Sequence, residues 1–527
     1  MGNKQYLKQT WIRGIIIIRK VKIENGTVQG MPSANTRITV FRGIPFAAPP
    51  VGALRWKAPQ PANDWGGVLK AYTFAPISMQ AIPGLSETDI YTREWNVDPK
   101  IHMSEDCLYL NVWTPAVCHG QRLPVFVWYF GGGLQVGNTA EMEFNGERIA
   151  NRGIVVVTVN YRLNVFGFLA HPELTAENPD FPTNFGHLDQ KFGTEWVKRN
   201  IEAFGGDPDN ITIGGQSAGG GSVLTQLVSP LNKGLFQRAI VQSGSMLGSY
   251  AGFGPGRTET LADAEKTGED FFRHLGVKTL AEARALDAVY IRDKFLDYPC
   301  EWGKFTTVAD GGYVPGNPME LLLNNQRHMV PLLMGHTSNE FLSVPDASSY
   351  HALETIAKAK YGSHADEFLA LCKMGNIEDS LIKATFSPIE LSIRAILKKT
   401  AEIKNAAANY YYIFDEEIPG WDNPGPFHSV DIWFFFETLG VCWRPFVGRH
   451  YNLARQMCNY WCNFIKNGNP NGVDADGSQM PHWDPFMESE CPMVFKNVPT
   501  MGEGSCQSDL MKFMVGYYLN SHGRLEN

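Results

Sequence analysis

The chain has 527 residues, of which 44% are hydrophobic and 19% charged, a composition typical of a folded globular protein. Its formal net charge is −8 and it contains no run of lysines and arginines. This argues against nucleic acid as a partner, because that binding needs clustered basic side chains. No apolar run approaches the roughly 20 residues that cross a membrane. We therefore expect a cytoplasmic protein with no membrane contact that acts on a small molecule.

The first segment in chain order has an apolar run, Gly14–Ile18, that follows basic residues in the manner of a signal sequence. The run is too short, since a signal core needs about 7–15 apolar residues. Tyr6 stands where a myristoylation motif requires Ser or Thr. We therefore expect no targeting segment here, and predict a β-strand that leads into the Glu24–Gly26 turn.

Further along the chain, short apolar runs rich in β-branched or aromatic residues alternate with segments of helical apolar spacing. The runs expected to be buried strands are 124–129, 154–161, 211–214, 238–242, 330–335 and 410–414. The expected helices include 186–204 and 217–228. This alternation predicts an α/β protein with a large, mostly parallel central sheet and helices on both faces.

Three other regions complete the expected organisation. Residues 15–60 are rich in turn residues and are predicted to form an antiparallel edge of the sheet. Residues 247–302 and 349–406 have helical patterns and are expected to be insertions that cap the sheet. Because no repeat or long Pro/Gly/Ser linker interrupts the chain, we expect a single domain over residues 1–527.

The strongest chemical signal is Gly215-Gln216-Ser217-Ala218-Gly219, which follows an apolar strand and leads into a helix. A GxSxG motif between strand and helix is typical of a nucleophile elbow, in which small neighbours permit a sharp turn. The helix dipole behind Ser217 would favour developing negative charge. The alternative is a glycine-rich turn that carries an ordinary surface serine.

A serine hydroxyl needs a base to remove its proton, and with such an elbow the chain order is Ser, acid, His. His428 lies in a loop after the 410–414 strand, and Glu340 follows the 330–335 strand. They are the expected base and acid. The rivals are His336 for the base, and Asp310 and Asp431 for the acid.

A glycine run, Phe130-Gly131-Gly132-Gly133, follows the 124–129 strand. Its bare backbone allows close approach to a substrate, so the N–H groups of Gly132, Gly133 and Ala218 are the expected oxyanion donors. The alternative is a glycine-rich β-turn without a catalytic role.

Several segments together carry a resemblance to a known family. They are 41–50, 105–112, 160–163, 203–219 and 461–471. From about Val21 to about Met514 the sequence resembles the type-B carboxylesterases, the carboxylesterase/cholinesterase group. The resemblance implies an α/β-hydrolase fold, a Ser217–Glu340–His428 triad and an oxyanion hole at Gly132, Gly133 and Ala218. It also implies hydrolysis of carboxylic esters with no cofactor and no metal.

The sequence departs from the family at three places. Cys107 lacks its usual disulfide partner, because Ser78 stands where relatives have cysteine. Phe130 replaces a His or Tyr, which removes a side-chain hydrogen bond but leaves the backbone donors. Gln216 replaces the acidic residue that many relatives have before the serine, and this argues against cationic choline esters as substrates.

The other cysteines and an aromatic run give weaker indications. The nine cysteines are scattered, and only Cys458 and Cys462 share a helix face, so we expect free thiols and no metal site. The run 433–436 is aromatic throughout. It is interpreted as core packing, with Trp433 and Phe434 as part of the pocket wall as the alternative.

We therefore expect a carboxylesterase that cleaves small short-chain or aryl esters through an acyl-enzyme, as a monomer or homodimer. Phe130, Gln216, Trp433 and Phe434 are the candidate pocket residues. A feruloyl esterase of plant cell-wall esters is the alternative enzyme, and a lipase is disfavoured because no large apolar lid is evident. A non-catalytic binding protein of the same fold is the alternative from another class.

Overall fold

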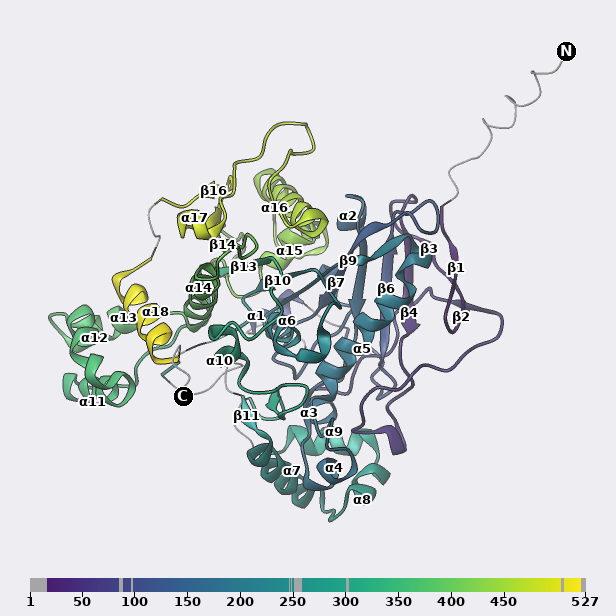
Figure 1. The fold of residues 1–527 in the computed structure, drawn as a ribbon, viewed down its shortest axis with the longest axis horizontal. Coiled ribbons are helices and arrows are strands. Elements are labelled where there is room, and N and C mark those ends of the chain that lie inside the picture. Colours follow the sequence, from purple (N-terminus) through teal and green to yellow (C-terminus); the bar gives the residue numbers. More distant parts are fainter. Residues whose placement is uncertain are drawn as a thin grey trace.

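An 11-stranded sheet runs through the molecule with the strand order β16-β15-β14-β13-β10-β9-β7-β8-β6-β4-β3 (Figure 1). The computed structural model describes residues 17–84, 89–95, 98–245, 247, 249–250, 258–299, 303–503 and 507–522. The strands are β3 (Met31–Pro32), β4 (Thr39–Pro45), β6 (Tyr109–Thr114), β7 (Leu123–Tyr129), β8 (Val155–Val159), β9 (Gly206–Gln216), β10 (Arg238–Gln242), β13 (Leu332–Thr337), β14 (Tyr410–Phe414), β15 (Met493–Phe495) and β16 (Thr500–Met501).

The middle of this sheet is parallel. Each pair from β8 through β7, β9, β10, β13 and β14 to β15 runs in the same direction. At the two edges the direction alternates, since β6, β4 and β3 pair antiparallel on one side and β16 on the other. The parallel core and the antiparallel edge in the N-terminal region are both as predicted.

The strand bounds show where local sequence is a poor guide. β10 and β14 match the predicted ranges, whereas β13 starts at Leu332, because Pro331 has no N–H to donate to a ladder. β9 begins at Gly206, where pairing with Leu123 of β7 extends it through a polar stretch. β6 lies outside the predicted strands.

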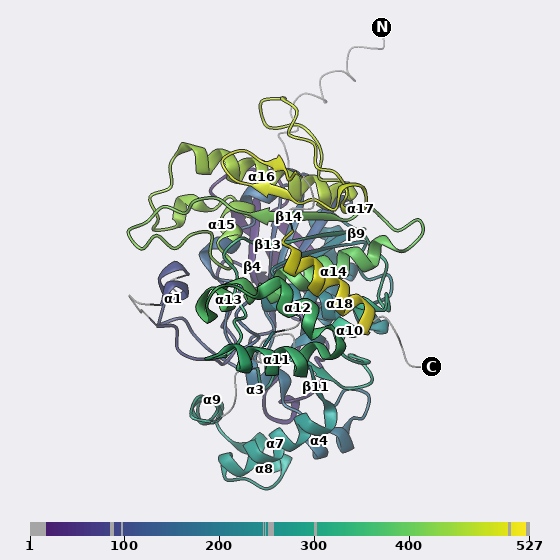
Figure 2. The same cartoon turned by 90° about the vertical axis from the view of Figure 1, so that its left-hand side faces the viewer.

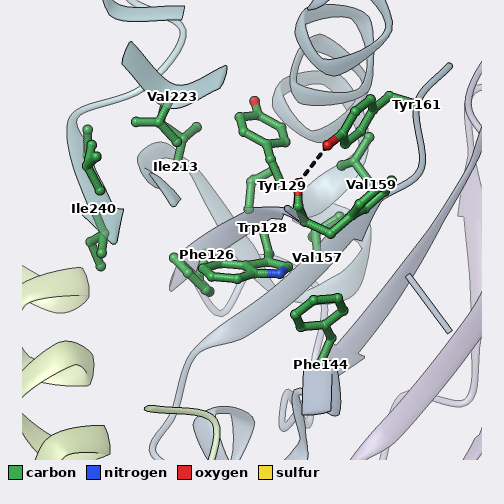
Figure 3. Close-up of a cluster of buried hydrophobic side chains, with 14 of the residues drawn as sticks. Phe126, Trp128, Tyr129, Phe144, Val157, Val159, Tyr161, Ile213, Val223 and Ile240 are labelled. Carbon is green, nitrogen blue, oxygen red and sulfur yellow. Dashed lines mark hydrogen bonds between the residues drawn. The ribbon is translucent and has the colours of Figure 1, made fainter. Parts of the chain in front are cut away.

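Helices cover both faces of the sheet. α5 (Phe185–Asn200) and α6 (Ala218–Val228) lie on one face, and Ile213 of β9 points toward Val223 of α6 (Figure 3). The neighbouring Thr212 points the other way, and its hydroxyl donates to the Ile465 carbonyl of α16 (Gly448–Asn467) at 3.4 Å. Because successive side chains of a strand alternate between faces, α6 and α16 lie on opposite sides.

A three-stranded sheet separate from the main one forms in the N-terminal region. β1 (Lys20–Ile23) and β2 (Gly26–Gln29) form an antiparallel hairpin around the predicted turn, and β5 (Val68–Lys70) joins β2 in parallel. The predicted N-terminal strand therefore starts at Lys20. The Gly14–Ile16 part of the apolar run lies outside the described residues.

The helical insertions form two groups at the periphery (Figures 1 and 2). One group comprises α7 (Leu261–Leu275), α8 (Leu280–Ala285) and α9 (Ala288–Leu296). The other comprises α11 (Tyr350–Tyr361), α12 (Ala365–Cys372), α13 (Ile377–Ala384) and α18 (Asp509–His522), which share a separate buried apolar cluster. α14 (Pro388–Ala401), which lies within the predicted cap, packs both on β13 and on α18, and its Leu391 belongs to the same apolar cluster.

The remaining short elements connect these layers. They are α1 (Ile90–Glu94), α2 (Glu147–Ala150), α3 (Asn164–Phe168), α4 (Pro172–Glu177), α10 (Pro318–Leu323), α15 (Asp431–Phe435), α17 (Phe486–Ser489), β11 (Glu259–Thr260) and β12 (Val308–Ala309). Short 3₁₀ turns occur at η1 (Gly52–Leu54), η2 (Met142–Phe144), η3 (Ile201–Phe204), η4 (Pro230–Asn232), η5 (Gly362–His364) and η6 (Leu439–Val441).

Aromatic packing fixes the end of β7, where the glycine run begins. Phe126, Trp128 and Tyr129 are fully buried, and Trp128 packs on Phe144 of η2 at 5.7 Å (Figure 3). The Tyr161 hydroxyl donates to the Phe130 carbonyl at 2.6 Å. The loop that carries Gly131–Gly133 is therefore attached to a rigid part of the core.

Candidate active site

Ser217 occupies a sharp turn between β9 and α6. Its backbone has φ 53° and ψ −126°, a strained conformation for a residue with a side chain. The turn is held by two backbone hydrogen bonds, from Ser217 N–H to the Gln242 carbonyl at 2.8 Å and from Gly221 N–H to the Ser217 carbonyl at 2.9 Å. This strand–turn–helix geometry is that of a nucleophile elbow.

The two flanking glycines of the motif are sterically required. A Cβ at Gly215 would lie 2.3 Å from the Gly219 carbonyl oxygen, and a Cβ at Gly219 would lie 2.1 Å from the Tyr129 carbonyl oxygen. Both contacts are with backbone atoms that cannot move aside. The close packing explains why the motif has glycine at these positions.

Glu340 and His428 meet beside the elbow. Nδ1 of His428 lies 2.5 Å from Oε2 of Glu340, and both side chains are buried. The other carboxylate oxygen of Glu340 accepts from the Ser243 hydroxyl at 2.5 Å and from the Thr337 N–H at 3.2 Å. Burial alone would raise the pKa of Glu340, but His428 and the Ser243 hydroxyl favour its charged form and lower the pKa overall.

The contact with Glu340 fixes the tautomer of His428. A carboxylate can only accept, so Nδ1 carries the proton and Nε2 of the neutral ring is an acceptor. The side-chain amide of Gln216 meets Nε2 at 3.2 Å. The ring centroid of Phe341, a residue that is 40% exposed, lies 4.5 Å from that of the imidazole.

The three rival residues have other partners. His336 contacts the Tyr411 hydroxyl at 2.8 Å through Nε2 and the Thr337 carbonyl at 2.7 Å through Nδ1. Asp431 accepts from the Gln242 amide at 3.0 Å and the Tyr412 hydroxyl at 2.7 Å, and Asp310 accepts from the Asn184 amide and the Val314 N–H, each at 2.8 Å. The structure therefore pairs His428 with Glu340, and not with a rival acid.

The glycine run lies against Ser217. A Cβ at Gly131 would lie 3.1 Å from Cβ of Ser217. Gly132 and Gly133 have φ of 101° and 67°, and a Cβ at Gly132 would lie 2.2 Å from the Val136 carbonyl oxygen. Within the described part of the chain, the N–H groups of Gly132, Gly133 and Ala218 donate to no protein acceptor. They can therefore stabilise an oxyanion that forms at Ser217.

Of the four candidate pocket residues, Gln216 lines the cavity beside Ser217. Phe130, Trp433 and Phe434 do not line it. Phe130 is 1% exposed and stacks on Tyr161 at 4.3 Å. Trp433 and Phe434 are completely buried, and Phe434 packs on Phe414 at 4.7 Å. The interpretation of the aromatic run as core packing is correct, because these rings are completely buried in the core and do not line the cavity beside Ser217.

The cavity beside Ser217 has a volume of about 410 Å³. Its lining includes Gly131 and Gly132 of the glycine run, Gln216 and Ser429, which adjoin Ser217 and His428 in sequence, and Ile432. Tyr91, Trp95, Glu141 and Glu143 also line it, and sequence reasoning missed all four. They belong to segments with no motif of their own, and only the fold brings them to the site.

The described cysteines are free, which agrees with the expected loss of the disulfide. Cys107 is buried, and its thiol lies within hydrogen-bonding reach of Ser78, the residue in place of the missing partner. The Cys458 and Cys462 sulfurs are 3.9 Å apart on one face of α16, as predicted. Cys300 and Cys506 lie outside the described residues.

The described residues contain neither a candidate metal centre nor a candidate membrane span. No group of three or more His, Cys, Asp and Glu side chains in the described part of the chain could hold a metal ion. No helix among the residues that the structure places is both long and apolar enough to cross a bilayer.

Comparison with known proteins agrees with this geometry. Residues 18–506 match the family model described as the carboxylesterase family. The chain belongs to the carboxylesterase family. Human cocaine esterase is 30% identical over 90% of this chain and 87% of its own length. Rabbit (Oryctolagus cuniculus) liver carboxylesterase 1 is 32% identical over 85% and 84%. A solved PNB esterase has a TM-score of 0.77 at 28% identity, over 94% of this chain and 99% of its own.

This carboxylesterase therefore has the α/β-hydrolase fold and hydrolyses carboxylic esters. The predicted family, fold and reaction are confirmed. Nothing in the comparisons favours the feruloyl esterase alternative.

Proposed function

We propose that Ser217, His428 and Glu340 hydrolyse small carboxylic esters through an acyl-enzyme. Ser217 Oγ attacks the ester carbonyl while Nε2 of His428 takes the hydroxyl proton. His428 then protonates the leaving alcohol. In the second half, His428 removes a proton from water, which attacks the acyl carbonyl and releases the acid and free Ser217.

The contact of 2.5 Å between Glu340 and His428 is the observation that carries this proposal. The carboxylate holds the ring with Nε2 facing the substrate side, and it stabilises the imidazolium that forms when the proton arrives. The Gly132, Gly133 and Ala218 N–H groups would receive the carbonyl oxygen as it becomes negative, and no metal or cofactor enters the reaction.

The proposed substrate is a small molecule with short acyl or aryl groups. A cavity of about 410 Å³ beside the elbow supports this size, since small-molecule sites span roughly 300–1,000 Å³. We also infer a cytoplasmic location, supported by the buried free thiol of Cys107.

The test is kcat/KM on p-nitrophenyl acetate, butyrate and octanoate, with methyl ferulate alongside, for the wild type and Ser217→Ala. We expect the short-chain esters to be cleaved best, and the variant to lose several orders of magnitude in turnover. Preference for methyl ferulate would favour a feruloyl esterase. Equal activity of the two proteins would mean that Ser217 is not the nucleophile.

A further inference from the structure

A second cavity lies between α2 and α16, away from the catalytic groups (Figure 1). Its volume is about 570 Å³, and it shares no lining residue with the cavity beside Ser217. The lining comes from α2 and the residues that follow it, from Glu437, from one face of α16 and from residues 472–475. The proposed ester hydrolysis uses none of these residues, so the cavity has no assigned role.

Two thiols of α16 meet at this cavity. Cys458 and Cys462 are four residues apart in the helix and therefore lie on the same face. Their sulfurs are 3.9 Å apart, within the range in which one thiol can donate to the other. Cys462 lines the cavity and is 1% exposed, whereas Cys458 is completely buried. A molecule in the cavity therefore reaches Cys462 first, and it must be small.

Two cations adjoin the thiol pair. Lys466 follows Cys462 by four residues on the same face of α16, and it lines the cavity. Arg152 also lines the cavity and lies close enough to both thiols to interact with them electrostatically. The Arg152 guanidinium is held in place because its Nε donates to the side-chain oxygen of Asn459 at 2.6 Å.

The acidic groups of the lining are already paired. Glu437 forms an ion pair with Arg152 at 2.8 Å, and Asp474 forms one with Arg455. Lys466 has no acidic partner within the residues that the structure describes. The cavity therefore carries unneutralised positive charge, although the whole chain has a net charge of −8.

This environment favours the thiolate of Cys462. Burial alone would raise the pKa of this thiol, but the hydrogen bond with Cys458 and the charges of Arg152 and Lys466 lower the pKa overall. Glu437 acts in the opposite direction with a smaller effect. Burial raises the pKa of Cys458, which therefore keeps its proton and remains the donor. The thiolate is the form of cysteine that attacks electrophiles.

We propose that Cys462 is a modification site for small hydroperoxides, which enter this cavity and oxidise the thiol to a sulfenic acid. The thiolate sulfur bonds to the terminal oxygen of the hydroperoxide, and the O–O bond breaks. The other oxygen leaves as hydroxide or alkoxide and takes a proton from solvent. The sulfur is oxidised by two electrons and the peroxide bond is reduced. Arg152 and Lys466 stabilise the negative charge that moves onto the leaving oxygen.

The helix prevents the sulfenic acid from closing a disulfide with Cys458. A disulfide requires Cβ atoms about 3.5–4.5 Å apart, whereas residues four apart on a helix have Cβ atoms about 5–6 Å apart. Both cysteines lie in the middle of α16, so a bond between them would distort the helix. The sulfenic acid should therefore persist long enough to be trapped.

The test is peroxide treatment of the reduced protein with dimedone present, which forms a thioether with sulfenic acids. Peptide mass spectrometry then measures the rate of labelling at each cysteine. The internal control is Cys118, which is exposed to solvent but is not part of this cavity. We expect Cys462 to be labelled about tenfold faster than Cys118 or more. Equal or slower labelling of Cys462 would overturn the proposal, as would a Cys458–Cys462 disulfide in place of the adduct.

Two variants test why Cys462 reacts. Cys458→Ala removes the hydrogen-bond donor and Lys466→Met removes a positive charge, so each should slow the labelling of Cys462 about threefold or more. Lys398→Met is the matched control, because Lys398 pairs with Glu490 and does not line this cavity. Circular dichroism checks that the variants fold. Labelling at the wild-type rate in both Cys458→Ala and Lys466→Met would contradict the proposed activation of the thiol.

Discussion

The side-chain amide of Gln216 lies 3.2 Å from Nε2 of His428, the ring nitrogen that must receive the Ser217 proton. Because Nδ1 donates to Glu340, the amide N–H and the serine hydroxyl compete for one lone pair. The residue before the nucleophile therefore acts on the base directly, and its identity should set the pH range of catalysis.

Gln216→Glu should move the acid limb of kcat/KM to higher pH by about one unit or more. A carboxylate at this place would favour the charged imidazole, so the base would stay protonated and inactive up to a higher pH. The measurement is the pH profile on p-nitrophenyl butyrate. Gln216→Met, which adds no charge, is the control, and an equal shift in both variants would refute the electrostatic explanation.

Glu340→Gln should lower kcat by about 10⁴-fold and leave the fold intact, because an amide does not hold the required tautomer of His428. Asp431→Asn should cost much less, since Asp431 bonds to Gln242 and Tyr412 and not to the base. Steady-state kinetics with circular dichroism checks both. A larger loss in Asp431→Asn would assign the acid to Asp431.

Gly132→Ala should lower kcat by about 10²–10³-fold through loss of an oxyanion donor. A Cβ there would meet the Val136 carbonyl oxygen at 2.2 Å, and the φ of 101° is unfavourable for alanine, so the loop must shift. Gly66→Ala is the control, because nothing lies within 4 Å of its Cβ position. If Gly132→Ala keeps the turnover of the wild type, this loop does not form part of the oxyanion hole.

Arg444→Met should destabilise the protein by about 3–5 kcal/mol, since it leaves the buried Glu94 carboxylate unpaired. Both side chains are completely inaccessible to solvent, and Arg444 also binds Asp422 at 3.0 Å. Lys398→Met removes an exposed pair with Glu490 and should cost about 0–1 kcal/mol. Urea unfolding measures the free energy of unfolding of the two variants. Similar decreases in both would contradict the claim that the buried ion pair stabilises the protein more than the exposed one.

Local patterns predicted the sheet and the triad because both depend on neighbours in sequence. The elbow at Ser217 is a strand, a turn and a helix in succession, and Glu340 and His428 each follow a strand at the same edge of the sheet. The chain order of serine, acid and histidine, together with these strand ends, was enough to predict Glu340 as the acid and His428 as the base. β6 and the first part of β9, before the predicted 211–214 strand, were missed, because partner strands determine their extent more than their own composition does.

The cavity wall could not be predicted in this way. Tyr91 and Trp95 lie before β6, and Glu141 and Glu143 lie between β7 and β8, so no spacing along the chain connects them to Ser217. Trp433 and Phe434 show the converse error. They are close to His428 in sequence, yet α15 turns their rings into the core.

Covalent labelling tests the central claim most directly. The wild type is treated with diethyl p-nitrophenyl phosphate, and release of p-nitrophenol is followed while peptide mass spectrometry locates the adduct. We expect one equivalent of p-nitrophenol per chain, loss of esterase activity in parallel, and a diethylphosphoryl group on Ser217 that is absent from Ser217→Ala. An adduct on another residue, or activity that survives full labelling of Ser217, would contradict the account.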